Sequence, residues 1–470
     1  MRYLPLFLYF VAYTANTAPI ATPLDSSPDL TRDQVQRAEN EARQQTENVS
    51  QTPVSMTSQD LLQQPDLLQN ALDTALNQQH IENIRFLLPL YRQLPEQNQD
   101  KVLIKYAEAI LMREDGKHTD AEKHLRILIN QYPDYAPIRL QLALTLSQNG
   151  QTREAEQEIK KIQQTPDLPQ PVTDYLSKFS HYLKHEREWQ FDGNAYYIQD
   201  NNVGRSPEQR IYGNWYFSEP RSAHGIGYEF SAQKTTPIKG HWATRIQTST
   251  YGKFYWDAHD YDDLITRAET GLVWRNAKQE FSAMPYFEKR WFGTTPYSHT
   301  TGGILRYSYI LSPQWQAFSA WQSGYKKHEE RKYLDGASHA ASISLLYRSS
   351  PQQFFVFGFG GGRENAKDLS ESYTHGNLRA SWSRNWGSQQ NLTTTLNGSI
   401  QQRHYRGSDI FNIRRHDTEY FTRLSLSHKK LTWRGFTPRV NWTWSHIRSN
   451  HFYYRYNQNR VFLDISKQFK

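Results

Sequence analysis

The sequence predicts an α + β chain of two parts, in which an all-α, tetratricopeptide-like solenoid precedes a transmembrane antiparallel β-barrel of about 14 strands. Three observations predict it. All 13 Trp lie at or after Trp189, together with 21 of the 30 Tyr and 22 of the 24 Gly. Before that point the chain repeats with a period of 34 residues. At its end, apolar residues alternate with polar ones up to an aromatic residue beside the C-terminus.

Composition limits the possible classes of protein. The mean hydropathy is −0.83, and the absence of a run of 18 apolar residues excludes a membrane-spanning helix in the mature chain. Barrel strands remain possible because they alternate polar and apolar residues. With no Cys, the chain has no disulfide, thiolate metal site or N-terminal lipidated Cys. The net charge of +8 is scattered along the chain, so we expect no nucleic-acid partner.

The N-terminus has the pattern of a secretory signal. Arg2 precedes an apolar run over residues 4–12, which is too short to span a bilayer. Small residues place the cleavage between Ala15 and Ala21, so we expect a signal peptide over 1–21, with a buried N-terminal strand as the alternative. The polar residues 22–60 predict a flexible linker, within which residues 32–46 favour a polar helix.

Residues 61–185 have helical apolar spacing and contain the repeat. Positions 34 residues apart match in four pairs, which are Ala109 and Ala143, Ala121 and Ala155, Leu125 and Ile159, and Leu128 and Ile162. Pro133 and Pro166 end the two units, and an earlier unit over 66–95 places Ala75 at the matching position. Small residues at this period are typical of tetratricopeptide repeats, because Ala lets two helices approach closely. We expect a periplasmic domain that holds a polypeptide segment; an ordinary helical bundle is the alternative.

Residues 186–470 are expected to form the barrel. Several segments alternate, with apolar residues on one face at positions 305, 307, 309 and 311 and again at 440, 442 and 444. Short turns are expected at 218–220, 311–313, 349–351 and 386–388, and longer polar loops at 258–263, 325–338 and 405–415. Short turns on one side and long loops on the other are typical of outer-membrane barrels, and an even strand number of about 14 fits this length. A soluble β-sandwich is the alternative.

The last strand carries the most specific signal. Val461, Leu463, Ile465 and Phe469 share one parity, which is the pattern of the terminal strand of an outer-membrane barrel. Two positions depart from it, since Lys467 replaces an apolar residue and Lys470 follows the final aromatic residue.

Together these parts resemble the surface lipoprotein assembly modulator family, over most of the mature chain. The best local stretches are Arg414–Tyr420, Gly435–Val440 and Asn459–Leu463. The resemblance implies an outer-membrane translocator in a Gram-negative envelope, which exports or displays surface lipoproteins or related soluble proteins of haem and iron acquisition. It also implies a client encoded by a neighbouring gene, periplasmic chaperones, the barrel-assembly machinery and outer-membrane lipid as partners. The client-binding residues stay unknown.

No residue pattern indicates an enzyme, a cofactor or a metal site. The glycine-rich run Gly358–Gly362 lacks the ending of a phosphate-binding loop and predicts a strand bend or a close backbone approach. Asp260, Asp262 and Asp263 lack the remaining ligands of a calcium loop, and Arg415–Asp417 has no metal-binding spacing. The alternative function is an exopolysaccharide export porin with a tetratricopeptide scaffold, although such scaffolds usually hold more repeats. A passive porin needs no helical adaptor, and a receptor driven from the inner membrane needs a plug domain, which the sequence lacks.

Overall fold

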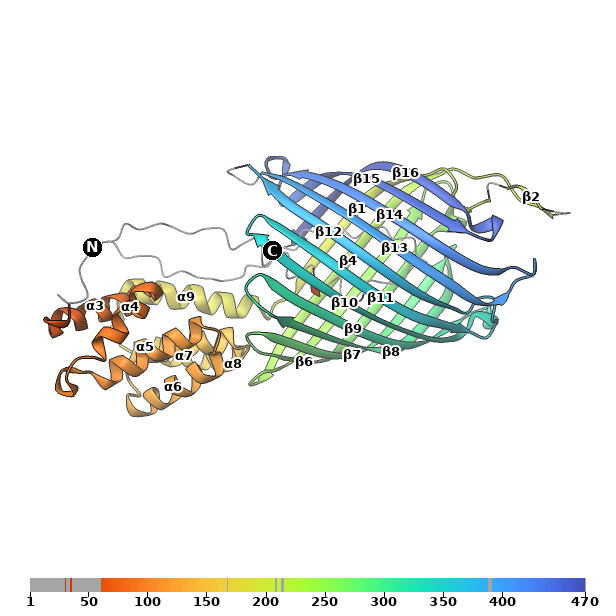
Figure 1. Cartoon of the computed structure of the whole chain (residues 1–470). Helices are drawn as coiled ribbons and strands as arrows, with labels where there is room; N and C mark the ends of the chain where they lie inside the picture. Colours follow the sequence, from red (N-terminus) through yellow and green to blue (C-terminus); the bar gives the residue numbers. More distant parts are fainter. Residues whose placement is uncertain are drawn as a thin grey trace.

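The computed structural model describes Leu30, Gln34, Val35 and residues 61–469, apart from 167, 208, 213–214 and 388–390. The predicted signal peptide lies outside these residues. A helical domain sits at one end of a closed β-barrel (Figure 1), which confirms the predicted fold class. No helix in the described part of the chain has the length and apolar character needed to cross a membrane.

The helical domain consists of paired helices. The described helices are α3 (Pro65–Asn77), α4 (Ile81–Tyr91), α5 (Lys101–Glu114), α6 (His118–Gln131), α7 (Ala136–Gln148), α8 (Thr152–Gln163) and α9 (Gln170–His185), with a 3₁₀ turn η1 (Glu96–Asn98). The Asp100 carboxylate caps α5 by accepting from the amides of Val102 and Leu103. Gly116 and Gly150, which follow α5 and α7, have φ of +74° and +78°, a backbone conformation that favours glycine.

The core of this domain consists of two apolar clusters. One joins α3, α4 and α5 around Leu68, Leu72 and Ile84. The other joins α5 to α9, where Phe179 and Leu183 of α9 pack against the second repeat. Because each helix pair covers the apolar face of the next, the pairs stabilise one another as in a solenoid.

The barrel has 14 antiparallel strands in the order β1–β16–β15 and so on to β4, which confirms the predicted number. The strands are β1 (Gln190–Asp200), β4 (Ala223–Lys239), β5 (Trp242–Tyr255), β6 (Asp263–Arg275), β7 (Gln279–Phe292), β8 (Thr295–Ile310), β9 (Trp315–His328), β10 (Gly336–Ser350), β11 (Gln353–Ala366), β12 (Tyr373–Trp386), β13 (Leu392–Ser408), β14 (Arg414–His428), β15 (Phe436–Ser449) and β16 (Tyr456–Phe469). A small hairpin of β2 (Ile211–Tyr212) and β3 (Trp215–Tyr216) lies in the connection between β1 and β4.

The two ends of the barrel differ. At the near end, beside the helical domain, most connections are short, such as the turns from β8 to β9 and from β10 to β11. At the far end several are longer and contain 3₁₀ turns, namely η2 (His259–Tyr261), η3 (Lys332–Leu334) and η5 (Phe452–Tyr454). A further turn, η4 (Lys429–Leu431), lies at the near end. The predicted turns at 311–313 and 349–351 and the predicted loop at 258–263 fall at these positions.

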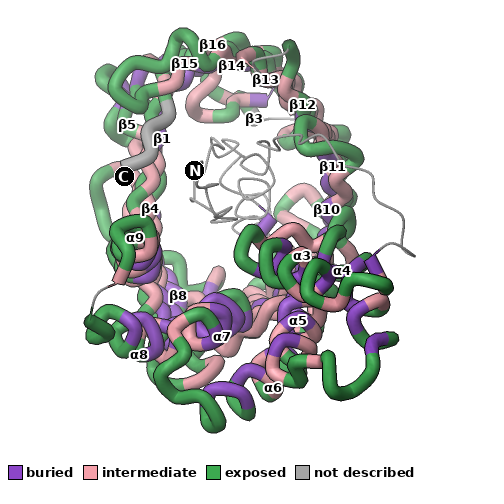
Figure 2. The backbone as a smooth tube through the Cα atoms, turned by 90° about the vertical axis from the view of Figure 1, so that its left-hand side faces the viewer, coloured by how far each residue is buried: buried purple, intermediate pink, exposed green. Residues whose placement is uncertain are grey.

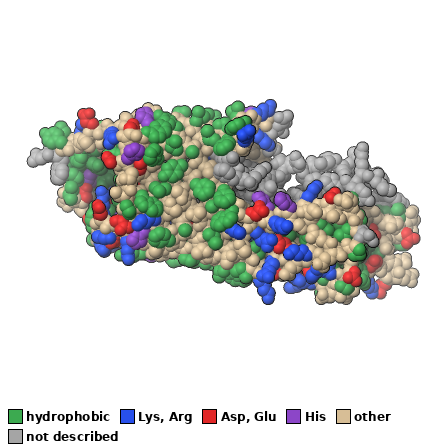
Figure 3. Space-filling model, turned by 180° about the vertical axis from the view of Figure 1, so that it is seen from behind, with side chains coloured by type: hydrophobic (Ala, Val, Ile, Leu, Met, Phe, Trp, Pro, Cys, Tyr) green, Lys and Arg blue, Asp and Glu red, His purple; other side chains and the backbone are tan. Residues whose placement is uncertain are grey.

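Each strand presents alternate residues to two environments. On β8, Ile304 and Arg306 are buried inside the barrel, whereas Leu305 and Tyr307 are exposed on its outer wall. In Figure 3 hydrophobic side chains cover much of this wall, and charged ones gather at the far end and over the helical domain. An apolar outer belt around a polar interior is the arrangement that a bilayer requires of a barrel.

Candidate functional site

The inner wall of the barrel is lined by buried charges that neutralise one another. The carboxylate of Asp464 on β16 lies 3.0 Å from Arg423 Nη2 and 2.8 Å from Arg439 Nε. Glu269 on β6 lies 2.7 Å from Arg306 Nη1. Further inner-wall pairs are Arg245–Glu280, Arg290–Asp263, Lys326–Glu364 and Arg403–Glu419. The wall is therefore polar, yet these charges are compensated, so it suits a water-filled passage.

One part of the inner wall is apolar. This apolar lumen patch consists of residues from β7 to β11, namely Met284, Ile304, Phe318, Ala320, Leu346, Phe354 and Val356. Two residues from before the helical domain pack on it, since Leu30 joins the cluster of Met284 and Val35 joins that of Phe318. Both are buried, as is Gln34. The sequence predicts a flexible linker over 22–60, and nothing in its polar composition indicates that Leu30 and Val35 pack on the inner wall of the barrel.

The helical domain is fixed to the barrel by hydrogen bonds to two near-end turns. Arg275, at the end of β6, donates to Thr152 Oγ1 at 2.7 Å. The amide of Gly240 donates to Glu154 at 2.7 Å, and His241 Nδ1 lies 2.9 Å from the Asn149 carbonyl oxygen. Viewed from the near end, the helices gather over one side of the barrel mouth and leave the side of β13 to β16 uncovered (Figure 2).

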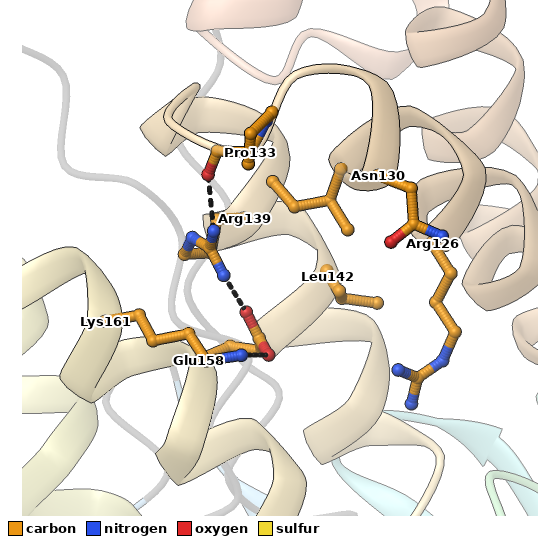
Figure 4. A pocket seen from close by; sticks show the side chains of 8 residues that line it. Arg126, Asn130, Pro133, Arg139, Leu142, Glu158 and Lys161 are labelled. Carbon is orange, nitrogen blue, oxygen red and sulfur yellow. Dashed lines mark hydrogen bonds and ion pairs between the residues drawn. The ribbon is translucent and has the colours of Figure 1, made fainter.

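A pocket of about 380 Å³ opens among α6, α7 and α8 (Figure 4). Ile129 and Leu142 give it apolar lining. Glu158 lies at its side, 2.5 Å from Arg139 Nη1 and 2.7 Å from Lys161 Nζ. The pocket therefore combines a small apolar surface with a mainly polar and basic lining.

Among the predicted repeat positions, Pro133 lines this pocket, whereas the others lie in the core of the helical domain. Six of them are at most 1% exposed, namely Ala109, Ala121, Leu125, Ala143, Ala155 and Ile159. Pro133 is exposed in the turn between α6 and α7, and its carbonyl oxygen accepts from Arg139.

In the last strand, Val461, Leu463 and Ile465 face outward and are 72%, 61% and 50% exposed. The backbone of Phe469 pairs with that of Phe191. These outward side chains lie on the same face as the apolar belt, where hydrocarbon is the matching environment.

Aromatic side chains tie three far-end connections together. The rings of Tyr212 and Phe452 stack with centroids 4.1 Å apart, and Phe411 meets both edge-on. Beside them the buried His451 Nε2 lies 2.6 Å from the Asp409 carboxylate. We call these five residues the far-end aromatic cluster. Their spacing in the sequence gives no sign that they meet.

The aspartates near residue 262, the segment Arg415–Asp417 and the glycine-rich run have structural partners in the barrel. Asp262 accepts from the Tyr255 amide at 2.7 Å, and the guanidinium of Arg415 lies 3.7 Å from the ring centre of Tyr405. At Gly358, a Cβ atom would lie 2.9 Å from Arg379 Nε, so this glycine run makes a close approach to the neighbouring strand. Over the described ranges, no group of three or more His, Asp or Glu could hold a metal ion.

A second histidine, besides His241, lies where the helical domain meets the barrel. Burial lowers the pKa of His118, at the start of α6, and the positive charges of Arg113 and Lys278 lower it further. Lys278 lies in the turn between β6 and β7, so the pKa of this histidine depends on a charge of the barrel as well as on its own domain.

Comparisons with known proteins match both parts of the chain. Residues 189–469 match the profile described as surface lipoprotein assembly modifier, and residues 54–159 match that of its N-terminal TPR repeats. The chain is 31% identical to surface lipoprotein assembly modifier 1 of Haemophilus influenzae, over 98% of this chain and 97% of that protein. It is 28% identical to the surface lipoprotein assembly modifier of Pasteurella multocida, over 99% and 96%. It is also 22% identical to the hemophilin secretion modulator of Acinetobacter baumannii, over 95% of each.

Proposed function

The chain belongs to the surface lipoprotein assembly modifier family, and from this premise we propose that it exports or displays particular client proteins on the cell surface. The proposed clients are surface lipoproteins or related soluble haem-acquisition proteins. The names of two relatives, which refer to surface lipoprotein assembly and to hemophilin secretion, support this class of client. The barrel lies in the outer membrane, in keeping with its apolar outer belt. The helical domain faces the periplasm.

The observation that carries this proposal is the fixed joint between the helical domain and a barrel with a polar lumen. Arg275, Gly240 and His241 hold the helical domain at the mouth. A client bound there has a high local concentration at the lumen, since the helical domain and the barrel belong to one chain. Folding of the client outside would then drive transfer, because a folded client no longer fits the path back.

The remaining parts of the proposal follow the sequence. A signal peptide over 1–21, a linker over 22–60, a periplasmic domain over 61–185 and a barrel over 186–470 form the division that we propose. The small repeat residues such as Ala109 and Ala143 allow the helix pairs to pack. The outward residues of the last strand, with Phe469, serve as the signal for the barrel-assembly machinery. Periplasmic chaperones deliver a client that is encoded nearby.

Surface labelling of a co-expressed client tests this function. The client is the signal-bearing product of a neighbouring gene, labelled on intact cells with the full chain, without it, and with residues 61–185 deleted. We expect surface client to need the full chain. Client display that is unchanged without the chain contradicts export. Undiminished display after the deletion removes the role of the helical domain, and loss of surface polysaccharide instead of client indicates the alternative function.

The pocket among α6 to α8 gives a sharper test of client contact. Arg126 and Lys161 stand on its rim with side chains 47% and 54% exposed. Reversal of both to Glu is expected to lower client display without unfolding the domain. Lys123→Glu is the matched control, since this side chain is 70% exposed and does not line the pocket. Equal display from the two variants would assign the client contact elsewhere.

A further inference from the structure

One seam of the barrel has far fewer backbone pairs than the others. Strands β1 and β16 pair over six positions, from Phe191–Phe469 to Tyr196–Asp464. The other thirteen seams pair over 11 to 14 positions each. Both strands are intact, because β1 pairs with β4 along its whole length and β16 pairs with β15 from Tyr456 to Lys467. The ladder of this seam therefore stops halfway, at Tyr196.

Side chains close the seam where the ladder stops. The Asp200 carboxylate lies 2.8 Å from Arg460 Nη2, at the positions that a continued register would bring together. Nearer the ladder, the rings of Tyr196 and Phe462 lie with centroids 5.6 Å apart. All four side chains belong to the inner-wall parity of their strands. Side chains are easier to separate than a ladder, because they can part without exposing a row of backbone groups to lipid.

We call the stretch beyond the ladder, from Tyr196 to Asp200 on β1 and the facing part of β16, the window. Other contacts bound it on both sides. The ladder from Phe191 to Tyr196 closes it on the near side. On the far side, the far-end aromatic cluster joins the connection that follows β1 to the one that precedes β16. Its outer face is apolar, since Tyr197 and Val461 are 46% and 72% exposed there. The window thus separates a polar lumen from the apolar belt in the far half of the barrel.

We propose that this window opens sideways and passes the acyl chains of a lipidated client from the lumen into the outer leaflet, with Asp200 and Arg460 as its latch. The inference rests on the proposed function. The polypeptide of such a client must end in water outside the cell, whereas its anchor must end in lipid. A wholly closed lumen delivers both the polypeptide and its acyl chains to water. There each methylene of the acyl chains is exposed to water, which is unfavourable. A gap in the wall delivers the anchor directly to hydrocarbon.

Cross-linking tests the window, and the chain has no Cys of its own. In the test variant, Asp200→Cys and Arg460→Cys are joined by a short bis-methanethiosulfonate linker that reductant removes. The control variant combines Arg460→Cys with Thr443→Cys, since these residues pair across the β15–β16 ladder. Both variants lose the same arginine, and the second cysteine replaces Asp200 on β1 in the test variant and Thr443 on β15 in the control. The test variant before addition of the linker shows the effect of losing Asp200 alone. The readout is surface display on intact cells of one client in two forms, acylated and non-acylated.

We expect the linker across the window to lower display of the acylated client at least tenfold, with recovery after reduction. Display of the non-acylated form, and of both forms with the control, should stay within twofold. Unchanged display of the acylated client overturns the proposal, and so does equal loss of both forms. If cells without the chain display both forms normally, the proposed function fails instead, and this outcome is distinct because it needs no cross-link.

A second measurement tests the latch alone. In the purified full chain, Asp200→Asn is expected to raise the amide exchange rates of the β1–β16 ladder at least threefold. The reason is that the ladder then holds the two strands together without the ion pair to Arg460. The charge swap of Asp200→Arg with Arg460→Asp should restore slow exchange. Exchange that does not change in Asp200→Asn removes the latch from the proposal.

Discussion

Replacing Gly150 by Ala is expected to loosen the helical domain from the barrel, whereas the same change at Gly116 is not. The two glycines occupy equivalent turns of successive repeats, with φ of +78° and +74°. A Cβ atom at position 150 would lie 2.7 Å from the carbonyl oxygen of Arg275. At position 116 it would lie 3.2 Å from Cε of Lys278, the flexible end of a side chain. The pair therefore separates backbone strain from the contact between domains.

The strain common to both variants is about 1–2 kcal/mol, the cost of a left-handed residue with a Cβ atom. Gly150→Ala must also displace the Arg275 backbone. That movement disturbs the hydrogen bonds from Arg275 to Thr152 and between His241 and Asn149. Two lost bonds at about 0.5–1.5 kcal/mol each give a further ~1–3 kcal/mol. The undocked population should then rise by about 5- to 150-fold, since 1.4 kcal/mol corresponds to tenfold.

Hydrogen exchange of the purified full chain in detergent measures this difference. Amides of residues 149–152 and 275–278 should exchange about tenfold faster in Gly150→Ala than in Gly116→Ala. Exchange within the β10–β11 ladder serves as the internal reference, because it lies away from the joint. Equal rates in the two variants would refute the reasoning, since they would show that the turn strain, and not the contact with Arg275, sets the stability of the joint.

Three other substitutions have expected outcomes. Asp464→Ala leaves two buried arginines without their carboxylate and should lower the free energy of unfolding by about 3–5 kcal/mol. The control Glu219→Ala removes an exposed side chain and should cost about 1 kcal/mol or less. Equal urea midpoints of the two variants in detergent would contradict this. Leu463→Arg on the outer wall should lower the free energy of unfolding by up to about 2–4 kcal/mol, depending on its depth in the bilayer. The fraction of barrel that runs as the folded, heat-modifiable band on a gel should fall with it. The inner-wall substitution Gln458→Arg is the control. Burial lowers the folded-state pKa of His118, so its contribution to stability is present above its unfolded value near 6.5 and is lost as pH falls through the folded value. When the pH falls from 7.5 to 5, the melting temperature of the helical domain should therefore fall less in His118→Phe than in the unsubstituted protein. An equal fall in both proteins would exclude His118 as the cause.

Local patterns predicted the architecture well. The alternation at Leu305 and Tyr307 identified a strand and its outward face, because side chains in a strand alternate by geometry alone. The match of Ala109 with Ala143 identified successive repeats, because helix packing requires a small residue at the same place in each. The length of the C-terminal part and the spacing of its strands then sufficed to predict the number of strands.

The functional surfaces depend on partners that the sequence does not bring together. Arg306 and Glu269 are 37 residues apart and come from β8 and β6, so their pairing reaches across an intervening strand. Asp464 and Arg423 do the same over 41 residues. The short ladder of β1 and β16 was equally hidden, because it depends on how closure of the whole barrel sets the register, and no local pattern encodes closure.

The far-end aromatic cluster lies outside the cell if the helical domain faces the periplasm. Tyr212 and Phe452 join the connections that leave β1 and enter β16, so a molecule that grips both from outside would hold the two strands at a fixed separation. An antibody fragment or a small cyclic peptide directed at these loops could therefore arrest the protein without entering the cell. Such a ligand would meet no outer-membrane permeability barrier, which gives this small group of rings a practical value as a target.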